Sequence, residues 1–336
     1  MKKVGIIGCG GIAQVHAWVL SSLEDVKLTL FCDIEPVRAR ELANKYAKDA
    51  EICADWRSVC DADVDVVHIC TPHMLHAPMA VGLLRSGKAV FSEKPCAVSL
   101  QQFEEMKREA ALHPGKLGFC FQNRYNGTTQ KLDSLVSEDR VGRIVGGRAF
   151  VTWRRDEDYY SCSLWKGRKE TEGGGVLINQ AIHTLDLLLR YLGEADVVKS
   201  SMAHHHLPAE KVEVEDTVEA WMSFPEGKRA CFYASNAYAK DAPVILELQG
   251  ECGRICMNGQ EVSLYPDDGP PEHFLCEKEL GIGKDYWGCG HRACITDFYR
   301  CLMTGERYGN DPGGVENTFR TMMRIYEEAE KNGGEG

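Results

Sequence analysis

The sequence predicts an α/β protein, with an N-terminal doubly wound parallel sheet and a C-terminal α+β domain built on a mainly antiparallel sheet. In the first third of the 336 residues, short β-branched runs alternate with helical patterns, which is typical of a parallel sheet with helices on both faces. After about Gln122, apolar residues in the later strands alternate at period two, which indicates an antiparallel sheet with one covered face. We therefore expect two domains, residues 1–122 and 123–336.

The elements of the first domain follow from these patterns in chain order. Strands are expected at 3–7, 27–32, 64–70, 89–91 and 117–121, and helices at 12–23, 36–48, 75–86 and 100–112. Right-handed crossovers between parallel strands then give the doubly wound topology.

The second domain is expected to combine helices with a sheet. Helices are predicted at 128–137, 175–192, 289–302 and 315–330, and strands between 195 and 257, most clearly at 214–224, 230–234 and 244–248. Pro225-Glu226-Gly227 separates two of these strands as a hairpin turn. Trp221 and Tyr233 fall on the outer face of the sheet, so we expect a partner subunit to cover that face in a homodimer or homotetramer.

Composition argues against several classes of protein. The formal net charge of −11 repels phosphate backbones, so a nucleic-acid partner is not expected. No apolar run approaches the roughly 20 residues of a membrane helix, and the N-terminus lacks a signal-peptide pattern, so we expect a cytoplasmic protein. The fifteen cysteines form no C-x-x-C pair, and His204-His205-His206 would point to alternate faces of a strand. No metal site is expected.

A glycine loop follows the first predicted strand and opens the first predicted helix. The pattern G-x-G-x-x-A is formed by Gly8, Cys9, Gly10, Gly11, Ile12 and Ala13. In this pattern the first glycine permits a tight turn, the second lets the backbone approach a pyrophosphate, and the helix N-terminus attracts the phosphates.

Asp33 ends the second predicted strand, where a carboxylate binds ribose hydroxyls and repels a 2′-phosphate. We therefore expect residues 1–122 to be an NAD-binding Rossmann domain. Arg38, five residues further on, would tolerate NADP. The alternative interpretation is a tightly packed turn in which Asp33 caps the next helix.

Ligands of an open parallel sheet bind beyond the carboxyl ends of its strands. Thr71 and Pro72 end one of the later strands, and Glu93-Lys94-Pro95 follow the next. Lys94 is thus predicted where a nicotinamide would lie, although a solvated Glu–Lys pair before a proline would give the same pattern. His76 is interpreted as a packing or capping residue near the cofactor rather than a metal ligand.

A second group of candidate residues follows Gly173-Gly174-Gly175, which suit a close approach of the backbone to a ligand. Asn179 and His183 are four residues apart and are predicted on one helical face. A histidine changes charge near pH 7, which suits the proton acceptor that alcohol oxidation requires. The plain alternative is a buried histidine. The charged, aromatic segment at 154–168 suits either a sugar-binding surface or an ordinary surface loop.

Together these motifs resemble the Gfo/Idh/MocA family, named for glucose-fructose oxidoreductase, inositol dehydrogenase and rhizopine catabolism. The resemblance covers nearly the whole chain. It rests on the glycine loop, residues 65–72, Glu93-Lys94-Pro95, residues 122–125, the pattern G-G-G…H-x-x-D, and residues 290–298.

The resemblance implies roles for several residues. Lys94 would contact both the nicotinamide side and the substrate hydroxyl, with a cis bond before Pro95, and His183 would exchange the proton, with Asp186 orienting its imidazole. Asn179 stands where the family often has Asp, and because an amide cannot take a proton we expect it to hydrogen-bond a substrate hydroxyl. The further cofactor contacts would be Cys70, Thr71, Pro72, His76, Glu93 and Gln122, and the further substrate contacts Arg124, Tyr160 and Trp165.

The function that follows is an NAD-dependent dehydrogenase or reductase. It would move a hydride between a nicotinamide and a secondary alcohol carbon of a sugar, glycoside or cyclitol. The alternative is a catalytically silent member of the same fold that binds dinucleotide and reports it to a partner protein. The presence of both Lys94 and His183 argues against that alternative.

Overall fold

The structure is a computed structural model that describes residues 1–277, 282 and 290–333. The chain forms two compact units. The first contains residues 1–125 with the described residues of 279–315, and the second contains the described residues of 126–278 and 316–336.

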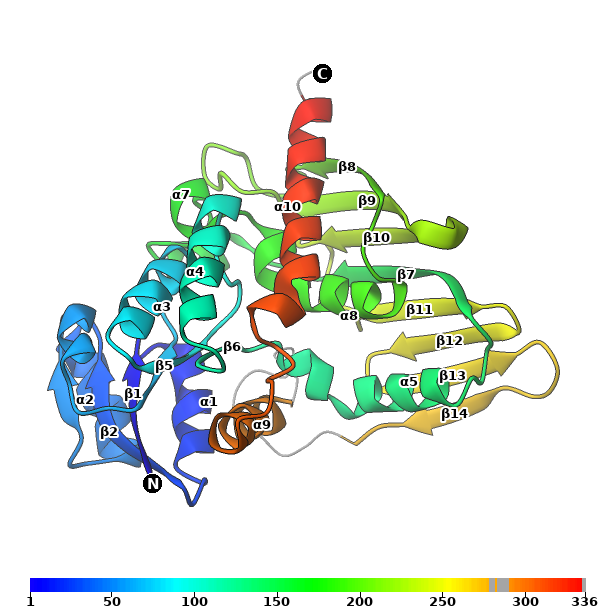
Figure 1. Cartoon of the computed structure of the whole chain (residues 1–336). Coiled ribbons are helices and arrows are strands. Elements are labelled where there is room, and N and C mark those ends of the chain that lie inside the picture. Colours follow the sequence, from blue (N-terminus) through cyan, green and yellow to red (C-terminus); the bar gives the residue numbers. More distant parts are fainter. Residues whose placement is uncertain (278–281, 283–289, 334–336) are drawn as a thin grey trace. The chain divides into compact units, whose positions relative to one another are not determined.

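The first unit is a doubly wound α/β sheet, as predicted. Six parallel strands lie in the order β3-β2-β1-β4-β5-β6. The strands are β1 (Lys2–Ile7), β2 (Val26–Cys32), β3 (Glu51–Cys53), β4 (Val66–Ile69), β5 (Ala89–Ser92) and β6 (Leu117–Phe119), and the helices are α1 (Gly11–Leu20), α2 (Pro36–Tyr46), α3 (His76–Arg85), α4 (Leu100–Leu112) and α9 (His291–Thr304). Helix α1 contacts α2 and α9, whereas α3 contacts α4 (Figure 1). Two groups of helices therefore cover the two faces of the sheet.

Helix α9 belongs to the first unit although it lies far along the chain. The Phe298 ring lies 5.0 Å from that of Phe91 in β5, and the Tyr299 ring stacks on His68 of β4 at 5.9 Å. Sequence analysis placed this helix in the second domain, because an amphipathic pattern does not say which sheet its apolar face covers. Residue 289, its predicted start, lies outside the described residues.

The second unit contains an eight-stranded, mainly antiparallel sheet, as predicted. Its order is β14-β13-β12-β11-β7-β10-β9-β8, and among the described strands β7 and β10 form the parallel pair. The strands are β7 (Ile144–Thr152), β8 (Val197–Ala203), β9 (Thr217–Ser223), β10 (Arg229–Ser235), β11 (Ile245–Gly250), β12 (Gly253–Asn258), β13 (Glu261–Pro266) and β14 (Glu272–Leu275). The helices are α5 (Gly127–Ser137), α6 (Glu157–Ser161), α7 (Lys169–Glu172), the π-helical turn η4 (Leu177–Ala181), α8 (Ile182–Leu192) and α10 (Pro312–Gly333).

One face of this sheet is packed against helices. Helix α8 contacts β7 and β11, and α5 contacts β12 and β13 (Figure 1). In β9, Val218, Ala220 and Met222 are at most 1% exposed, whereas Trp221 on the other face is 64% exposed. The predicted alternation is confirmed, and the outer face carries a large exposed aromatic side chain.

Strand β7, in the middle of the sheet, was not predicted. Its sequence I-V-G-G-R-A-F-V-T contains two adjacent glycines and an arginine, which hide the alternation of apolar residues that indicates a strand. Strands β3, β13 and β14 were also missed. Among the described helices, none combines the length and apolar character needed to cross a lipid bilayer.

Candidate active site

The glycine loop forms a cradle at the carboxyl end of β1. Gly8 has a φ of +85°, and a Cβ there would lie 2.7 Å from the carbonyl group of Cys70, so only glycine fits the turn. A Cβ on Gly10 would meet no atom within 4 Å. Helix α1 begins at Gly11 with no side chain capping it. Its first N–H groups and the open space at Gly10 fit the pyrophosphate of a dinucleotide.

Asp33 is buried directly behind this loop. Its Oδ2 accepts a hydrogen bond from the Cys9 N–H at 2.7 Å, and its Oδ1 accepts one from the Glu35 N–H at 2.9 Å. The carboxylate therefore also holds the glycine loop against the end of β2. Arg38 forms an exposed ion pair with Glu35 at 3.0 Å.

His76 ties together the two loops that follow β4 and β5. Its Nδ1 lies 2.8 Å from the Pro95 carbonyl oxygen and its Nε2 lies 2.8 Å from the Thr71 carbonyl oxygen. Burial lowers the pKa of this imidazole. Because both ring nitrogens face backbone carbonyls, His76 links the loops that follow β4 and β5.

The loop after β5 contains the cis peptide bond Lys94–Pro95, which the resemblance implied. Glu93, just before it, is buried, and its Oε2 accepts a hydrogen bond from the Lys94 N–H at 3.3 Å. Burial acts to raise the pKa of Glu93, but hydrogen bonding to His16 and nearby positive charge outweigh it and hold the pKa well below its usual value. Lys94 thus follows an ionised, buried carboxylate.

A chain of buried polar side chains leads from Glu93 into the core. Glu93 Oε1 lies 2.9 Å from His16 Nε2, His16 Nδ1 lies 2.8 Å from His68 Nδ1, and His68 Nε2 lies 3.0 Å from the Tyr299 hydroxyl. An ionised carboxylate only accepts, so His16 Nε2 donates to Glu93. The two buried histidines therefore connect Glu93 to Tyr299 of α9.

Sequence reasoning missed this chain, because His16 and His68 occupy positions that read as apolar core. The same region contains a group of potential metal ligands among the described residues. Atoms of His16, Glu93 and Cys120 lie within 4.8 Å of one another. The His16–Glu93 distance of 2.9 Å is that of a hydrogen bond.

Gln122 and Arg124 lie just after β6, in the first unit. Gln122 is buried, and its Oε1 lies 3.8 Å from Cys120 Sγ. The Arg124 guanidinium donates to the Gly309 and Gly314 carbonyl oxygens and to Asn310 Oδ1. The structure thus gives Arg124 a role in anchoring the segment after α9, besides the substrate contact that the resemblance implied.

In the second unit, the three glycines precede a π-helical turn rather than a continuous α-helix. A Cβ on Gly175 would lie 1.9 Å from the Glu215 carbonyl oxygen. The N–H groups of Gly175 and Leu177 donate to the Glu215 carboxylate at 2.7 and 3.1 Å, and the Tyr326 hydroxyl donates to it at 3.0 Å. We expected the backbone at these glycines to approach a ligand closely. At Gly175 the backbone instead approaches Glu215.

Asn179 lies in the π-helical turn and His183 in the first turn of α8. Asn179 Nδ2 donates to Glu172 Oε1 and lies 3.4 Å from the Tyr159 hydroxyl. His183 is 7% exposed, and its Nδ1 is buried. Asp186, expected to orient the imidazole, accepts a hydrogen bond from the Thr318 hydroxyl at 2.6 Å.

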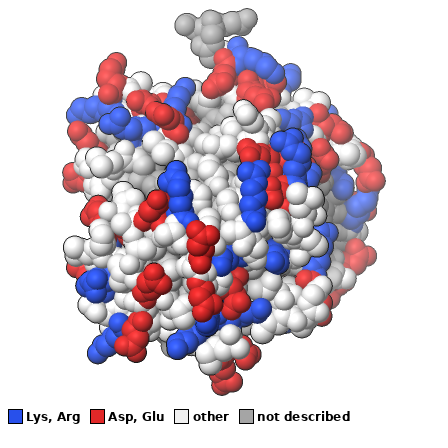
Figure 2. All heavy atoms as spheres, turned by 60° about the vertical axis from the view of Figure 1, so that its left-hand side comes forward, with Lys and Arg blue, Asp and Glu red and all other residues white. Residues whose placement is uncertain are grey.

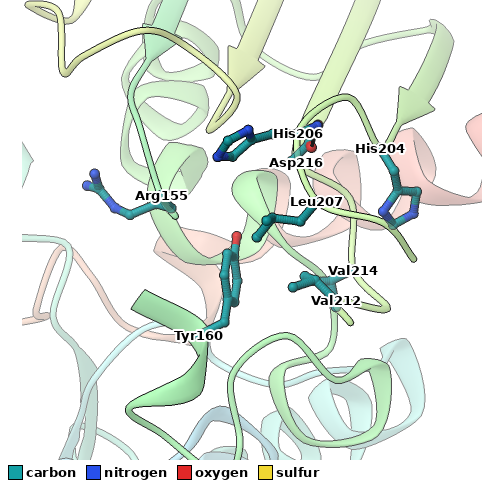
Figure 3. Close-up of a pocket in the computed structure, with 8 residues that line it drawn as sticks. All are labelled: Arg155, Tyr160, His204, His206, Leu207, Val212, Val214 and Asp216. Carbon is teal, nitrogen blue, oxygen red and sulfur yellow. Dashed lines mark hydrogen bonds between the residues drawn. The ribbon is translucent and has the colours of Figure 1, made fainter. Parts of the chain in front are cut away.

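Tyr160 packs into a small apolar cluster with Val212 and Val214. The cluster borders a narrow pocket (Figure 3), which is lined by Arg155, Tyr160, His204, His206, Leu207, Val212, Val214 and Asp216. The Asp216 carboxylate accepts hydrogen bonds from the N–H groups of His205 and His206, which holds this histidine segment in place. Trp165 is half-buried, and its carbonyl oxygen accepts a hydrogen bond from the Thr171 hydroxyl at 2.6 Å.

Glu172 is the second group that sequence reasoning missed. It is 1% exposed and lies beside Asn179. Burial raises the pKa of Glu172 to about 7, although hydrogen bonds from Gly167 and Asn179 act in the opposite direction. A charged residue just before three glycines gives no signal of burial in the sequence.

Two models of one protein family match the chain. The model described as an oxidoreductase family with an NAD-binding Rossmann fold matches residues 2–119, and the model of the GFO/IDH/MocA C-terminal domain matches residues 129–256. The chain belongs to the Gfo/Idh/MocA family. Its first unit contains an NAD-binding Rossmann domain, which the glycine loop predicted.

Several named dehydrogenases are similar to this chain. D-glucoside 3-dehydrogenase of Escherichia coli strain K12 is 34% identical over 60% of this chain and 57% of that protein. Inositol 2-dehydrogenase of Rhizobium meliloti strain 1021 is 24% identical over 81% of this chain and 82% of that protein. Among solved structures, the WlbA dehydrogenase from Chromobacterium violaceum, crystallised with NADH and UDP-GlcNAcA, superposes with a TM-score of 0.85. Its sequence is 25% identical to this one, and the match covers 98% of this chain and 94% of that chain.

In this Gfo/Idh/MocA protein, the candidate residues divide between the units. The glycine loop, Asp33, the strand ends at 70–72 and 93–95, and residues 122–124 belong to the first unit. Tyr160, Trp165, Asn179 and His183 belong to the second.

Proposed function

We propose that this protein is an NAD-dependent dehydrogenase that oxidises a secondary alcohol of a sugar, glycoside or cyclitol, or reduces the corresponding ketone. The observation that carries the proposal is the loop after β5. There Lys94 follows a buried, ionised Glu93 at the same sheet edge as the glycine loop. The similar proteins named dehydrogenases of glucosides and inositols support the substrate class.

The chemistry requires a hydride acceptor and a proton acceptor. Bound NAD⁺ would supply the hydride acceptor. In our proposal the Lys94 ammonium stabilises the negative charge that develops on the substrate oxygen, and an imidazole nitrogen of His183 takes the proton from that oxygen. Because His183 Nδ1 is buried, we assign the proton transfer to Nε2. In the reductive direction the same nitrogen returns the proton.

We infer that NAD is preferred over NADP. The Asp33 carboxylate ends β2 beside the glycine loop, and Arg38 is paired with Glu35. A 2′-phosphate would therefore meet a negative charge from Asp33 and an arginine that already has an acidic partner.

We also infer a homodimer or homotetramer that acts in the cytoplasm without a nucleic-acid partner. The exposed Trp221 on the outer sheet face supports the assembly. No disulfide joins the cysteines of the described chain, which suits a reducing compartment. Acidic and basic side chains lie interspersed on the face shown in Figure 2, and the net charge is negative.

The test is a screen for NADH formation by absorbance and fluorescence over sugars, glycosides and inositols, with NAD and NADP in parallel. We expect turnover of at least one ring polyol and a higher kcat/KM with NAD. If the protein binds NADH by calorimetry but turns over no polyol or ketone of the panel, the silent alternative replaces this proposal.

A further inference from the structure

A buried carboxyl group lies behind the amide of Asn179. Glu172, the last residue of α7, accepts hydrogen bonds from Asn179 Nδ2 at Oε1 and from the Gly167 N–H at Oε2, both at 2.5 Å. The Tyr159 hydroxyl lies 3.4 Å from the same Asn179 nitrogen. The carboxyl group thus contacts the backbone at Gly167 and a side chain of the proposed substrate site.

Several ionisable groups face Glu172 from the elements around it. Lys166, in the loop before α7, favours the carboxylate, whereas Glu215, before β9, disfavours it. The negative charge of Glu172 also helps to raise the pKa of the hydroxyl groups of Tyr160 in α6 and Tyr326 in α10. Burial is the largest effect, and it raises the pKa of this carboxyl to about 7. Both protonation states are therefore populated at neutral pH.

The two protonation states of Glu172 require opposite ends of the Asn179 amide. A carboxylate only accepts hydrogen bonds, so it faces the NH2 group of the amide, as in the structure. A protonated carboxyl group has an O–H donor, which the carbonyl end of the amide accepts. A half turn of the amide exchanges its two ends with little change in shape, since the groups are almost the same size.

We propose that Glu172 sets the hydrogen-bonding character that Asn179 presents to the reacting oxygen of the substrate. With Glu172 as a carboxylate, Asn179 presents its carbonyl oxygen, which accepts a hydrogen bond from an alcohol. With Glu172 as a carboxylic acid, Asn179 presents its NH2 group, which donates to a ketone oxygen that has no hydrogen of its own. Glu172 acts through Asn179 as a positioning residue, and this inference rests on the proposed dehydrogenase function.

The KM for the ketone and the KM for the alcohol should depend differently on pH. As pH rises from 6 to 8, Glu172 loses its proton, so the KM for the ketone should rise relative to the KM for the alcohol, by about tenfold for the exchange of one neutral hydrogen bond. The change should have a midpoint near pH 7 and should appear in KM rather than kcat. Initial rates in both directions from pH 5.5 to 9 measure it.

Glu172→Gln is the decisive variant, because it keeps the size of the side chain and cannot ionise. Its ratio of ketone to alcohol KM should change less with pH than that of the wild-type protein, because only the contribution of His183 remains. Glu170→Gln, an exposed position on the same helix, is the matched control and should keep the wild-type profile. A pH-independent ratio in the wild-type protein, or an unchanged profile in Glu172→Gln, would overturn the inference.

A second measurement does not depend on turnover. With ¹⁵N-asparagine labelling, the side-chain NH2 signal of Asn179, assigned by its loss in Asn179→Ala, should shift with a midpoint near pH 7 in the wild-type protein and stay constant in Glu172→Gln. A signal that does not respond to pH in the wild-type protein overturns the coupling itself. A titrating signal in a protein that turns over no polyol supports the coupling and removes the proposed reaction.

Discussion

At the scale of single residues, Lys94 and His183 carry the proposed chemistry from different units of the chain. Lys94 follows the buried Glu93, and His183 is nearly buried in α8. Loss of a positioned acid–base or charge-stabilising group typically costs roughly 10²–10⁴ in rate. We expect Lys94→Ala and His183→Ala each to lower kcat by about that factor on the best substrate, with NAD affinity nearly unchanged. Near-wild-type turnover in His183→Ala would remove it from the mechanism.

Asp33 has a structural task besides cofactor choice, because it accepts the Cys9 N–H of the glycine loop. We expect Asp33→Ala to weaken NAD binding and to narrow the preference over NADP. Asp33→Asn removes the charge but keeps an oxygen for the Cys9 N–H, so it should narrow the preference with a smaller loss of NAD affinity. Calorimetric titration of both variants with both dinucleotides measures this. Tighter binding of NADP than NAD by the wild-type protein would contradict it.

Glu93 should make the stability of the protein depend on acid pH. Its pKa in the folded protein lies below the ordinary value of 4.5, so the ionised group stabilises the fold above about pH 4.5, and this stabilisation is lost as pH falls further. Relative to Glu93→Gln, the wild-type protein should therefore lose unfolding free energy between pH 6 and pH 3. Denaturant unfolding of both proteins over this range tests the sign. A constant difference would show that Glu93 is not held ionised.

At the scale of elements, two glycine segments differ in how much space surrounds the glycine Cα. At Gly10 a methyl group would meet no protein atom, whereas at Gly175 it would meet the Glu215 carbonyl oxygen at 1.9 Å. We expect Gly10→Ala to keep its thermal stability and lose NAD affinity, because the methyl group occupies the space for the pyrophosphate. Gly175→Ala should lower stability by roughly 1–3 kcal/mol through overpacking. Thermal unfolding and NAD titration of both variants separate the two roles, and the reverse pattern would refute them.

The elements that the sequence predicted share a simple periodicity. The parallel strands and the alternation in β9 depend on local patterns, and the structure confirms them. Strand β7 was not predicted because two adjacent glycines interrupt its alternation of apolar and polar residues. His16 and His68 were not predicted as functional residues because their hydrogen-bond partners lie more than fifty residues away in the sequence. Glu172 was not predicted because charged residue types give no signal of burial. His16, for example, pairs with Glu93, which lies 77 residues further along the chain.

At the scale of the whole molecule, the outer face of the eight-stranded sheet should be an assembly surface. Trp221 is 64% exposed at the β9 position opposite Lys199 of β8 and Cys231 of β10. A charged residue on such a surface opposes association, so Trp221→Glu should shift the protein toward monomers. Lys228→Glu, at a half-buried position between the turn Pro225–Gly227 and β10, is the control. Sedimentation at micromolar concentration measures both, and a monomeric wild-type protein would contradict the assembly.

The discontinuous first unit affects how the chain can be made. Residues 1–125 leave the ribosome long before α9, whose Phe298 and Tyr299 lie against Phe91 and His68. The nascent nucleotide-binding sheet therefore waits with part of its aromatic core uncovered, a state that is prone to aggregation and is a target for chaperones. A chain cut short anywhere before α9 lacks this covering helix.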